Sequence, residues 1–188
     1  MWRNSTSSYG WISIALHWIS ALTVFGLFGV GLWMVELTYY SPWYQQAPAL
    51  HKAVGLLLAA TLVLRLLWRI VNPKPEAPRN HSIAERLGAR LGHLALYGLM
   101  LGVLISGYLI STADGRGISL FGLLEVPALV SGLPEQAEIA GEIHFYLAWT
   151  LVLLAGLHGL AAIKHHLIDK DTTLRRMIAP LHSNRSTS

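Results

Sequence analysis

Five histidines lie in the most apolar parts of this sequence, and their placement suggests chemistry. They are His17, His51, His93, His144 and His158. An imidazole can bind a metal or exchange a proton near neutral pH. Ionisable side chains inside apolar helices are costly and usually mark a functional path. For any single position the simpler interpretation is a structural histidine bonded to a neighbour, but five of them across the apolar segments are harder to explain in that way.

The clearest spacing occurs in residues 141–171, GEIHFYLAWTLVLLAGLHGLAAIKHHLIDKD. Each helical residue turns about 100° and rises about 1.5 Å. His144 and His158 are 14 residues apart, so they share one face of a helix and are separated by about 21 Å along it. His165 continues the same stripe about 10 Å further on.

The segments that hold these histidines are apolar enough for a membrane. Of the 188 residues 53% are hydrophobic and 13% are charged, and the mean hydropathy is +0.46. Crossing about 30 Å of hydrocarbon takes about 20 residues. Four stretches qualify, at about 11–35, 50–70, 87–111 and 139–167. We predict an all-α fold, a four-helix transmembrane bundle formed by one domain over residues 1–188.

The remaining segments are connections. The apolar run 118–133 is short and broken by glycine and proline, so it is predicted to be an interfacial segment rather than a fifth span. The first span is too long for a signal peptide and lacks a small-residue cleavage site, so we expect it to be retained. Residues 180–188 form a polar tail. The absence of cysteine excludes disulfides, iron–sulfur clusters and covalent C-x-x-C-H haem attachment.

The distribution of lysine and arginine predicts that both termini are cytoplasmic. The connection between the second and third spans, with its helix ends, is rich in cations, and so is the C-terminal tail. The other two connections carry only Lys52 and Arg116 among several glutamates. Because positive residues stay inside, this places the N- and C-termini together in the cytoplasm. The formal charge of +4 lies beside apolar segments and therefore favours a membrane over nucleic acid.

This topology sorts the histidines into two layers. His51 and His144 lie near the outer surface, whereas His17, His158 and, by depth alone, His93 lie near the inner one. Two imidazoles per layer without cysteine fit bis-histidine b-type haem, since haem iron takes axial imidazole and bundle cores hold such cofactors. Zinc would require a third or fourth ligand, and the spans offer no intramembrane Asp, Glu or Cys.

The local sequence resembles the bacterial cytochrome b561 family, four-helix di-haem membrane cytochromes, over nearly the whole chain. The matching stretches are ALHW with His17, LHKAVGLLL with His51, GHLALY with His93, EIHFYLAW with His144, and GLHGLAAIKHHLIDKDTTL from His158. It is also similar to the cytochrome b subunits that serve hydrogenases and formate dehydrogenases. The resemblance implies a bacterial inner-membrane protein with one haem between His17 and His158 on the cytoplasmic side, and another between His51 and His144 on the periplasmic side.

The family pattern, not depth, assigns the inner iron to His17 rather than His93. We then expect His93 at the haem edge or at a quinone, with a helix-packing histidine as the alternative. Arg65 follows His51 by 14 residues and lies at the inner level, where it could hold a haem propionate by charge-assisted hydrogen bonds.

Further residues are expected near the haems. Lys52 and Arg116 could hold the outer haem as Arg65 would the inner one, although all three could equally be ordinary interfacial cations. Gly55 and Gly102 are expected to face a haem, because a flat macrocycle between helices needs faces without side chains. Close helix packing is the alternative use of such glycines.

Quinone chemistry couples electrons to protons, and histidine can supply the proton exchange. We therefore predict a ubiquinone head near His165 and His93, with Ser13 one turn before His17. The alternative for His165 is a solvated surface cluster with Lys164 and Asp169.

The predicted function is transmembrane electron transfer between a periplasmic donor or acceptor and a membrane quinone. Some members of the family are implicated in oxidising superoxide, which would make the chain a superoxide:ubiquinone oxidoreductase. That reaction benefits from an electropositive outer funnel, and these outer connections are rich in glutamate, which favours a periplasmic redox protein. The alternatives are a haem-bearing anchor subunit of a larger respiratory dehydrogenase, with an oligomer or dehydrogenase as partner, and a colourless metal-ion transporter.

Overall fold

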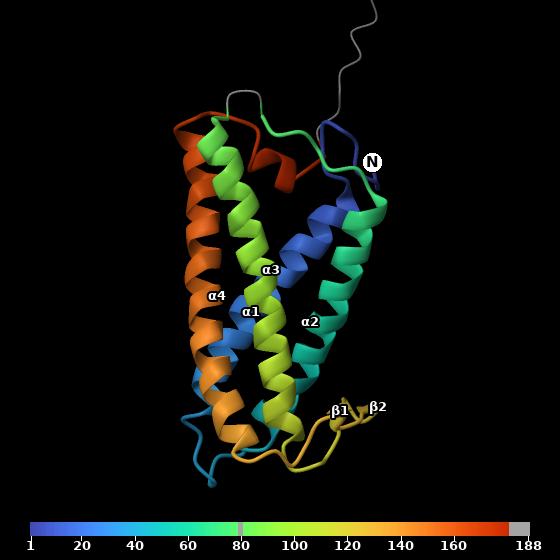
Figure 1. Ribbon diagram of the computed structural model, residues 1–188, viewed down its shortest axis with the longest axis vertical. Coiled ribbons are helices and arrows are strands. Elements are labelled where there is room, and N and C mark those ends of the chain that lie inside the picture. Colours follow the sequence, from blue (N-terminus) through green and yellow to red (C-terminus); the bar gives the residue numbers. More distant parts are fainter. Residues whose placement is uncertain (79–80, 181–188) are drawn as a thin grey trace, which may run out of the picture.

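Four long helices dominate the structure, a computed structural model that describes residues 1–78 and 81–180. They are α1 (Trp11–Met34), α2 (Gln46–Val71), α3 (Ile83–Thr112) and α4 (Gln136–Leu167), and they run along the length of the molecule (Figure 1). All four are long and apolar enough to cross a membrane, which confirms the predicted four-helix transmembrane fold. Most of the predicted polar tail, 180–188, lies outside the described residues.

Helix α1 begins at the predicted residue, whereas α2, α3 and α4 begin about one turn before the predicted apolar stretches. At α3 the reason is a capping box: the Ser82 hydroxyl accepts a hydrogen bond from the Glu85 backbone N–H at 3.2 Å, and the Glu85 carboxylate accepts one from the Ser82 N–H at 2.8 Å. These two contacts satisfy N–H groups that the first helical turn leaves unpaired, so the polar turn before the apolar run is also helical.

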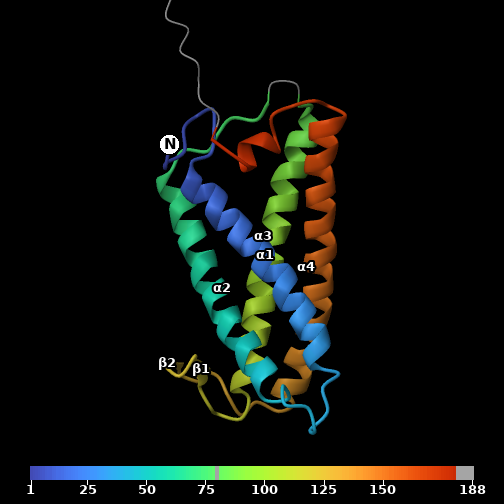
Figure 2. The ribbon, with the colours of Figure 1, turned by 180° about the vertical axis from the view of Figure 1, so that it is seen from behind.

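The four helices pack as two pairs. Helix α3 lies along α4 and α1 lies along α2, while α1 also contacts α4 and α2 contacts α3. Helix α1 crosses the molecule diagonally from the α2 side towards α4 (Figure 2). Leu58, Leu62, Met100 and Leu151 form the buried core between the pairs. This arrangement brings all four helices together near the middle of the bundle.

The predicted interfacial segment 118–133 contains a feature that the sequence analysis did not foresee. Residues Ile118–Leu120 (β1) and Leu124–Val126 (β2) form an antiparallel hairpin, and β1 contacts α2. Residues 121–123 join the strands, since Leu120 pairs with Leu124, and Phe121 and Gly122 both have positive φ, of 54° and 75°, as the central residues of a type I′ turn require. Leu123 is exposed at this turn, as an interfacial location permits. The segment is a connection and not a fifth span, as predicted.

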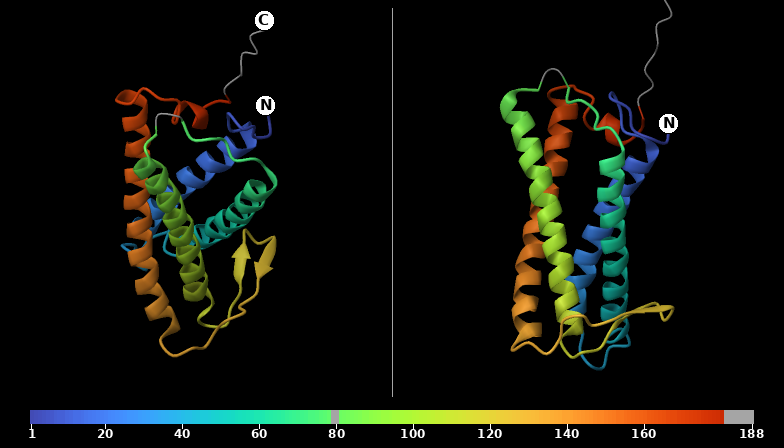
Figure 3. Two further views of the ribbon diagram at one scale, coloured as in Figure 1. Left: turned by 45° about the horizontal axis from the view of Figure 1, so that its top comes forward. Right: turned by 45° about the vertical axis from the view of Figure 1, so that its right-hand side comes forward.

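The N-terminus and the last described residues, up to residue 180, lie at the end of the bundle opposite the hairpin (Figure 3). There the short 3-10 helix η1 (Arg175–Met177) lies between the two helix pairs (Figure 1). The Trp18 indole N–H donates to the Met177 carbonyl at 2.6 Å, and the Arg176 guanidinium donates to the Glu76 carbonyl at 2.7 Å. The C-terminal segment therefore connects α1 with the chain that follows α2. We call this the terminal end and the opposite one the hairpin end.

Candidate functional site

The structure brings His51 and His144 together near the hairpin end. His51 lies in the second turn of α2 and His144 in the third turn of α4, so two antiparallel spans bring them to similar depth. Their ring centres are 6.3 Å apart and their planes are inclined by 70°. We refer to them as the outer pair.

A second histidine group lies towards the terminal end. The rings of His17 on α1 and His158 on α4 have centres 6.4 Å apart, with planes inclined by 67°. His93 on α3 is also close, its ring centre 5.1 Å from that of His158. Its Nδ1 lies 2.6 Å from the Ala89 carbonyl of its own helix, and its side chain is exposed, whereas His17 and His158 are half-buried. We refer to these three residues as the inner group.

The separation within each pair suits one metal ion between two imidazoles. Two metal–nitrogen bonds of about 2.0 Å, together with the distance from each ring nitrogen to its ring centre, give about 6 Å between ring centres. Both observed separations, 6.3 Å and 6.4 Å, match this value. The rings are too far apart for a hydrogen bond between them and too close for an intervening side chain. The histidine pairs therefore fit a bis-imidazole iron site.

Two glycines lie directly against the outer pair. A Cβ atom on Gly31 would be 3.3 Å from Cε1 of His51, and one on Gly107 would be 3.0 Å from Cε1 of His144. A side chain at either glycine would push the neighbouring imidazole away by a few tenths of an ångström. The absence of a Cβ therefore lets both rings occupy their present positions. Sequence reasoning had no signal for Gly31 and Gly107, because their importance depends on which neighbouring helix each one faces.

The glycines that were expected to face a haem lie in different surroundings. A Cβ on Gly102 would come within 2.9 Å of the Leu147 side chain, a contact that favours the alternative of close packing between α3 and α4. A Cβ on Gly55 would have no neighbour within 4 Å, so this face of α2 is open to a flat group.

Hydrogen bonds orient the outer imidazoles differently. Nδ1 of His144 lies 2.9 Å from the Val103 carbonyl and 3.2 Å from the Ser106 hydroxyl. If Nδ1 donates to the carbonyl, Nε2 carries the lone pair that a metal needs, an arrangement common in metal-binding histidines. Nδ1 of His51 is buried without a hydrogen-bond partner. A buried polar atom of this kind requires an explanation, and a bound group is one.

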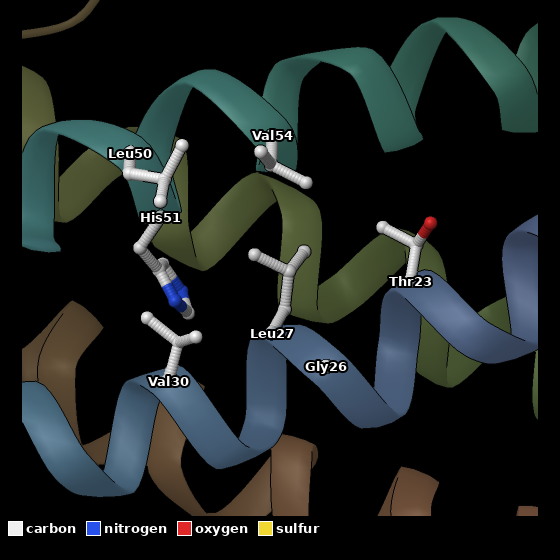
Figure 4. A pocket seen from close by; sticks show the side chains of 7 residues that line it. All are labelled: Thr23, Gly26, Leu27, Val30, Leu50, His51 and Val54. Carbon is white, nitrogen blue, oxygen red and sulfur yellow. The ribbon is translucent and has the colours of Figure 1, made fainter.

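A small apolar cavity of about 180 Å³ adjoins the outer pair between α1 and α2. In Figure 4 the His51 side chain points from α2 towards Val30 on α1, with Leu27 and Gly26 along the same helix. Cofactor sites are typically lined by apolar residues with a few polar groups, as here. The cavity thus gives a flat apolar group access to the His51 ring.

Arg65 lies at the level of the inner group, as predicted. Its Nη2 is 3.0 Å from Nδ1 of His17, and its guanidinium lies over the Tyr97 ring at 5.3 Å. A guanidinium can only donate, so in this contact Nδ1 of His17 is the acceptor and Nε2 bears the hydrogen. Iron ligation through Nε2 requires the other tautomer. Arg65 must therefore leave Nδ1 when His17 ligates a metal.

The other two cations predicted to hold a haem, Lys52 and Arg116, are exposed. The exposed Arg116 side chain pairs with Asp114, its Nε donating to the carboxylate at 2.7 Å. This hydrogen bond to Arg116 lowers the pKa of Asp114 below its ordinary value. Lys52 is exposed at the start of α2.

The residues expected at a quinone fall into separate groups. The Ser13 hydroxyl donates to Asn4 at 2.7 Å and accepts from the Trp68 indole at 3.1 Å. His165 instead lies among acidic residues, with Nδ1 2.7 Å from Asp169 and 3.4 Å from Asp171. Within the described residues no hydrogen bond, ion pair or ring contact joins Ser13, His93 and His165 to one another.

Comparison with known proteins adds independent information. A family model described as prokaryotic cytochrome b561 matches residues 8–180. The chain is 52% identical to "Cytochrome b561 homolog 2" of Escherichia coli (strain K12) over 181 residues, which cover 96% of each chain. It is 28% identical to "Probable superoxide oxidase CybB" of Yersinia pestis over 176 residues, or 90% of this chain and 95% of the relative. "Cytochrome b561 homolog 1" of Escherichia coli is 27% identical over 169 residues.

Proposed function

The chain belongs to the prokaryotic cytochrome b561 family of multi-pass membrane cytochromes, and from that premise we propose that it carries electrons across the bacterial inner membrane through two b-type haems. His51 and His144 would hold one iron and His17 and His158 the other. The observation that supports this most strongly is the separation of ring centres, 6.3 Å and 6.4 Å, in two pairs at different depths. Bound there, haem supplies one-electron redox chemistry without covalent attachment.

The protein's own contribution is to fix the positions of four imidazoles. His144 and His158 are 14 residues apart on one rigid helix, which spaces the two sites about 21 Å apart along the membrane normal. Ligation on both faces leaves an iron no ready position for oxygen, so the arrangement favours electron carriage.

We assign His17, not His93, to the inner iron. His17 lies in the first helix at 6.4 Å from His158, the separation that the outer pair repeats, whereas His93 is 5.1 Å away and exposed. Arg65 would then turn from His17 towards a haem propionate, because its present contact requires a tautomer that cannot ligate through Nε2.

A membrane quinone is the proposed partner at the terminal end, which we place in the cytoplasm because the cationic connections lie there. His165 would exchange the proton that accompanies quinone redox chemistry. His165→Ala should retain both haems while the rate of haem reduction by ubiquinol falls, and His166→Ala is the matched control on the next residue. Unchanged ubiquinol kinetics in His165→Ala would refute this assignment.

A periplasmic redox protein is the proposed partner at the hairpin end. A distant relative is named a probable superoxide oxidase. An anionic substrate is attracted by positive potential. In this chain Arg116 is paired with Asp114, and glutamates 36, 125, 135, 138 and 142 surround the same end. We therefore expect superoxide to reduce the purified cytochrome slowly, with little acceleration at low ionic strength.

The decisive experiment is the reduced-minus-oxidised visible spectrum of the purified protein with haem quantitation. Two b-type haems per chain, both reducible by ubiquinol, support the proposal. A colourless protein from cells supplied with haem would refute it and favour metal-ion transport. Copurification of a large dehydrogenase would instead identify the chain as the haem-bearing anchor subunit of a respiratory complex.

A further inference from the structure

A group of metal-binding side chains lies at the terminal end, apart from the histidine pairs. His81 precedes α3, His165 is in the last turn of α4, and Asp171 follows α4. Nε2 of His81, Nδ1 of His165 and a carboxylate oxygen of Asp171 all lie within 4.8 Å of one another. We call these three residues the terminal triad. His81 lies 90 residues before Asp171, so only the fold brings it to the other two.

The triad is shielded from water and its single carboxylate is held by hydrogen bonds. The side chains of His81, His165 and Asp171 are only 10%, 16% and 4% exposed. Oδ1 of Asp171 accepts a hydrogen bond from the Thr173 N–H at 2.7 Å, and the Asp171 N–H donates to the His165 carbonyl at 3.0 Å. Burial acts to raise the pKa of Asp171, but hydrogen bonds from Thr173 and His81 outweigh it and lower the pKa. This carboxylate is therefore ionised at neutral pH.

The two imidazoles face the same oxygen. Nε2 of His81 is 2.7 Å from Oδ2 of Asp171, and Nδ1 of His165 is 3.4 Å from it. The rings stack with centres 4.7 Å apart and planes inclined by 28°. In a tetrahedral zinc site with bonds of about 2.0–2.1 Å, neighbouring ligand atoms are about 3.3–3.4 Å apart. The contacts of the two imidazole nitrogens with Asp171, at 2.7 Å and 3.4 Å, lie near this spacing, and all three ligand atoms are within 4.8 Å of one another.

A further observation points to a ligand. Nδ1 of His165 is buried and makes no hydrogen bond of acceptable geometry, although Oδ2 of Asp169 is only 2.7 Å away. The two atoms are close, but their geometry is not that of a hydrogen bond. Because this buried nitrogen makes no hydrogen bond, it is suited to donate its lone pair to a cation.

The surrounding charges favour a dication. The carboxylates of Asp169, Asp171 and Glu85 outnumber the ammonium of Lys164, which is 2.7 Å from Asp169 and 3.5 Å from Glu85. Because Lys164 already neutralises part of Asp169, the three triad residues are the ligands expected, with water in the fourth position. Two imidazoles and one carboxylate suit zinc and similar first-row ions rather than magnesium or calcium.

We propose that His81, His165 and Asp171 form a binding site for a divalent transition-metal ion at the terminal end, with Zn²⁺ as the probe ion. The site lies apart from the histidine pairs, and it shares His165 with the proposed quinone site. If His165 also exchanges protons with a quinone, an ion on Nδ1 would block that exchange, and Zn²⁺ would slow ubiquinol oxidation without removing haem. Binding should weaken in acid, because a metal competes with protons for imidazole.

The test uses the haem-loaded protein, with any histidine tag removed and adventitious metal stripped by a chelator. Equilibrium dialysis against Zn²⁺, followed by elemental analysis of zinc and iron, should give one zinc per chain. His81→Gln and Asp171→Asn should each weaken binding about tenfold or more. His166→Gln, which alters the neighbouring exposed imidazole, should leave it unchanged. Zinc binding that is unsaturable, or equal in His81→Gln and His166→Gln, would show a hydrogen-bonded cluster only.

A second measurement does not depend on any variant folding. Cu²⁺ added to the unaltered protein at one equivalent should give an electron paramagnetic resonance spectrum with couplings to two imidazole nitrogens, distinct from the ferric haem signals. A copper spectrum without nitrogen coupling would overturn the proposal. Neither readout uses quinone turnover, so failure of the quinone assignment would leave the metal test intact.

Discussion

The outer pair and the inner group use the same residue type in different ways. Near the hairpin end, His51 and His144 face each other with Gly31 and Gly107 directly behind them. Towards the terminal end, His158 has two imidazole neighbours, and Arg65 contacts one of them. The outer pair permits a single choice of ligands, whereas the inner group permits two.

The two regions differ in how far geometry alone identifies the proposed ligands. At the outer pair, distance, burial and the unpartnered Nδ1 of His51 all favour the same two ligands. In the inner group the third imidazole and the guanidinium must be assigned by additional properties, namely the exposure of His93, its bond to Ala89 and the repeated separation of 6.4 Å. Substitutions at the two places should therefore differ in their consequences.

The largest expected effect is at the outer pair. His144→Ala removes a proposed ligand, and among the described residues the ring contact given for His144 is with its partner His51. Haem content should fall from two per chain to one, measured by haem extraction against protein concentration. His166→Ala, an exposed position on the same helix, should keep both. Two haems in His144→Ala would show that this residue is not a ligand.

The inner group allows a sharper test, because His17 and His93 are alternative partners of His158 and can be substituted separately. His17→Ala should lose the inner haem and retain the outer one, whereas His93→Ala should keep both. The measurement is again haem per chain, with low-temperature spectra to identify which haem is lost. The reverse result, loss in His93→Ala alone, would move the inner iron to His93.

A smaller effect is expected from the glycine that lies against His144. In Gly107→Val the added Cβ would meet Cε1 of His144 at 3.0 Å, so the ring must shift. Overpacking of this kind costs about 1–3 kcal/mol, and it should lower both outer-haem retention and thermal stability. Gly98→Val is the control on the same helix, because a Cβ there meets nothing within 4 Å. Equal behaviour of the two variants would contradict the proposed role of Gly107.

The smallest effect is expected at Arg65. Arg65→Gln removes a positive charge beside the inner group without removing a ligand, so haem content should not change. The loss favours the more positive, oxidised iron and should lower the inner midpoint potential by about 60 mV, equivalent to about 1.4 kcal/mol for one electron. Potentiometric titration measures this. Arg116→Gln, which alters an exposed pair with Asp114, should leave both potentials unchanged.

Much of the fold followed from the sequence because span length and charge distribution are local properties. The four helices, the absence of a fifth span in 118–133 and the two-layer placement of histidines needed only periodicity and topology. The hairpin was missed because its turn depends on Phe121 adopting φ of 54°, which no pattern predicts for this residue type.

The sequence predicted the depth of each site residue along its helix, but it did not predict which neighbouring side chain each residue faces. Spacing gave the depth of His144 and His158, but it could not show that Gly107 faces His144 while Gly102 faces Leu147, because that depends on the rotation of α3 against α4. His81 was missed for a related reason. His81 lies in a polar connection, and only its contact with Asp171, 90 residues later, identifies it as a candidate metal ligand.

The bond from the Trp18 indole to the Met177 carbonyl joins residues 159 positions apart. During synthesis α1 enters the membrane first, yet this contact cannot form until residue 177 has left the ribosome. While the later spans are inserted, α1 therefore lacks this hydrogen bond at the terminal end. The C-terminal segment can thus be fixed to α1 only after all four spans have been synthesised.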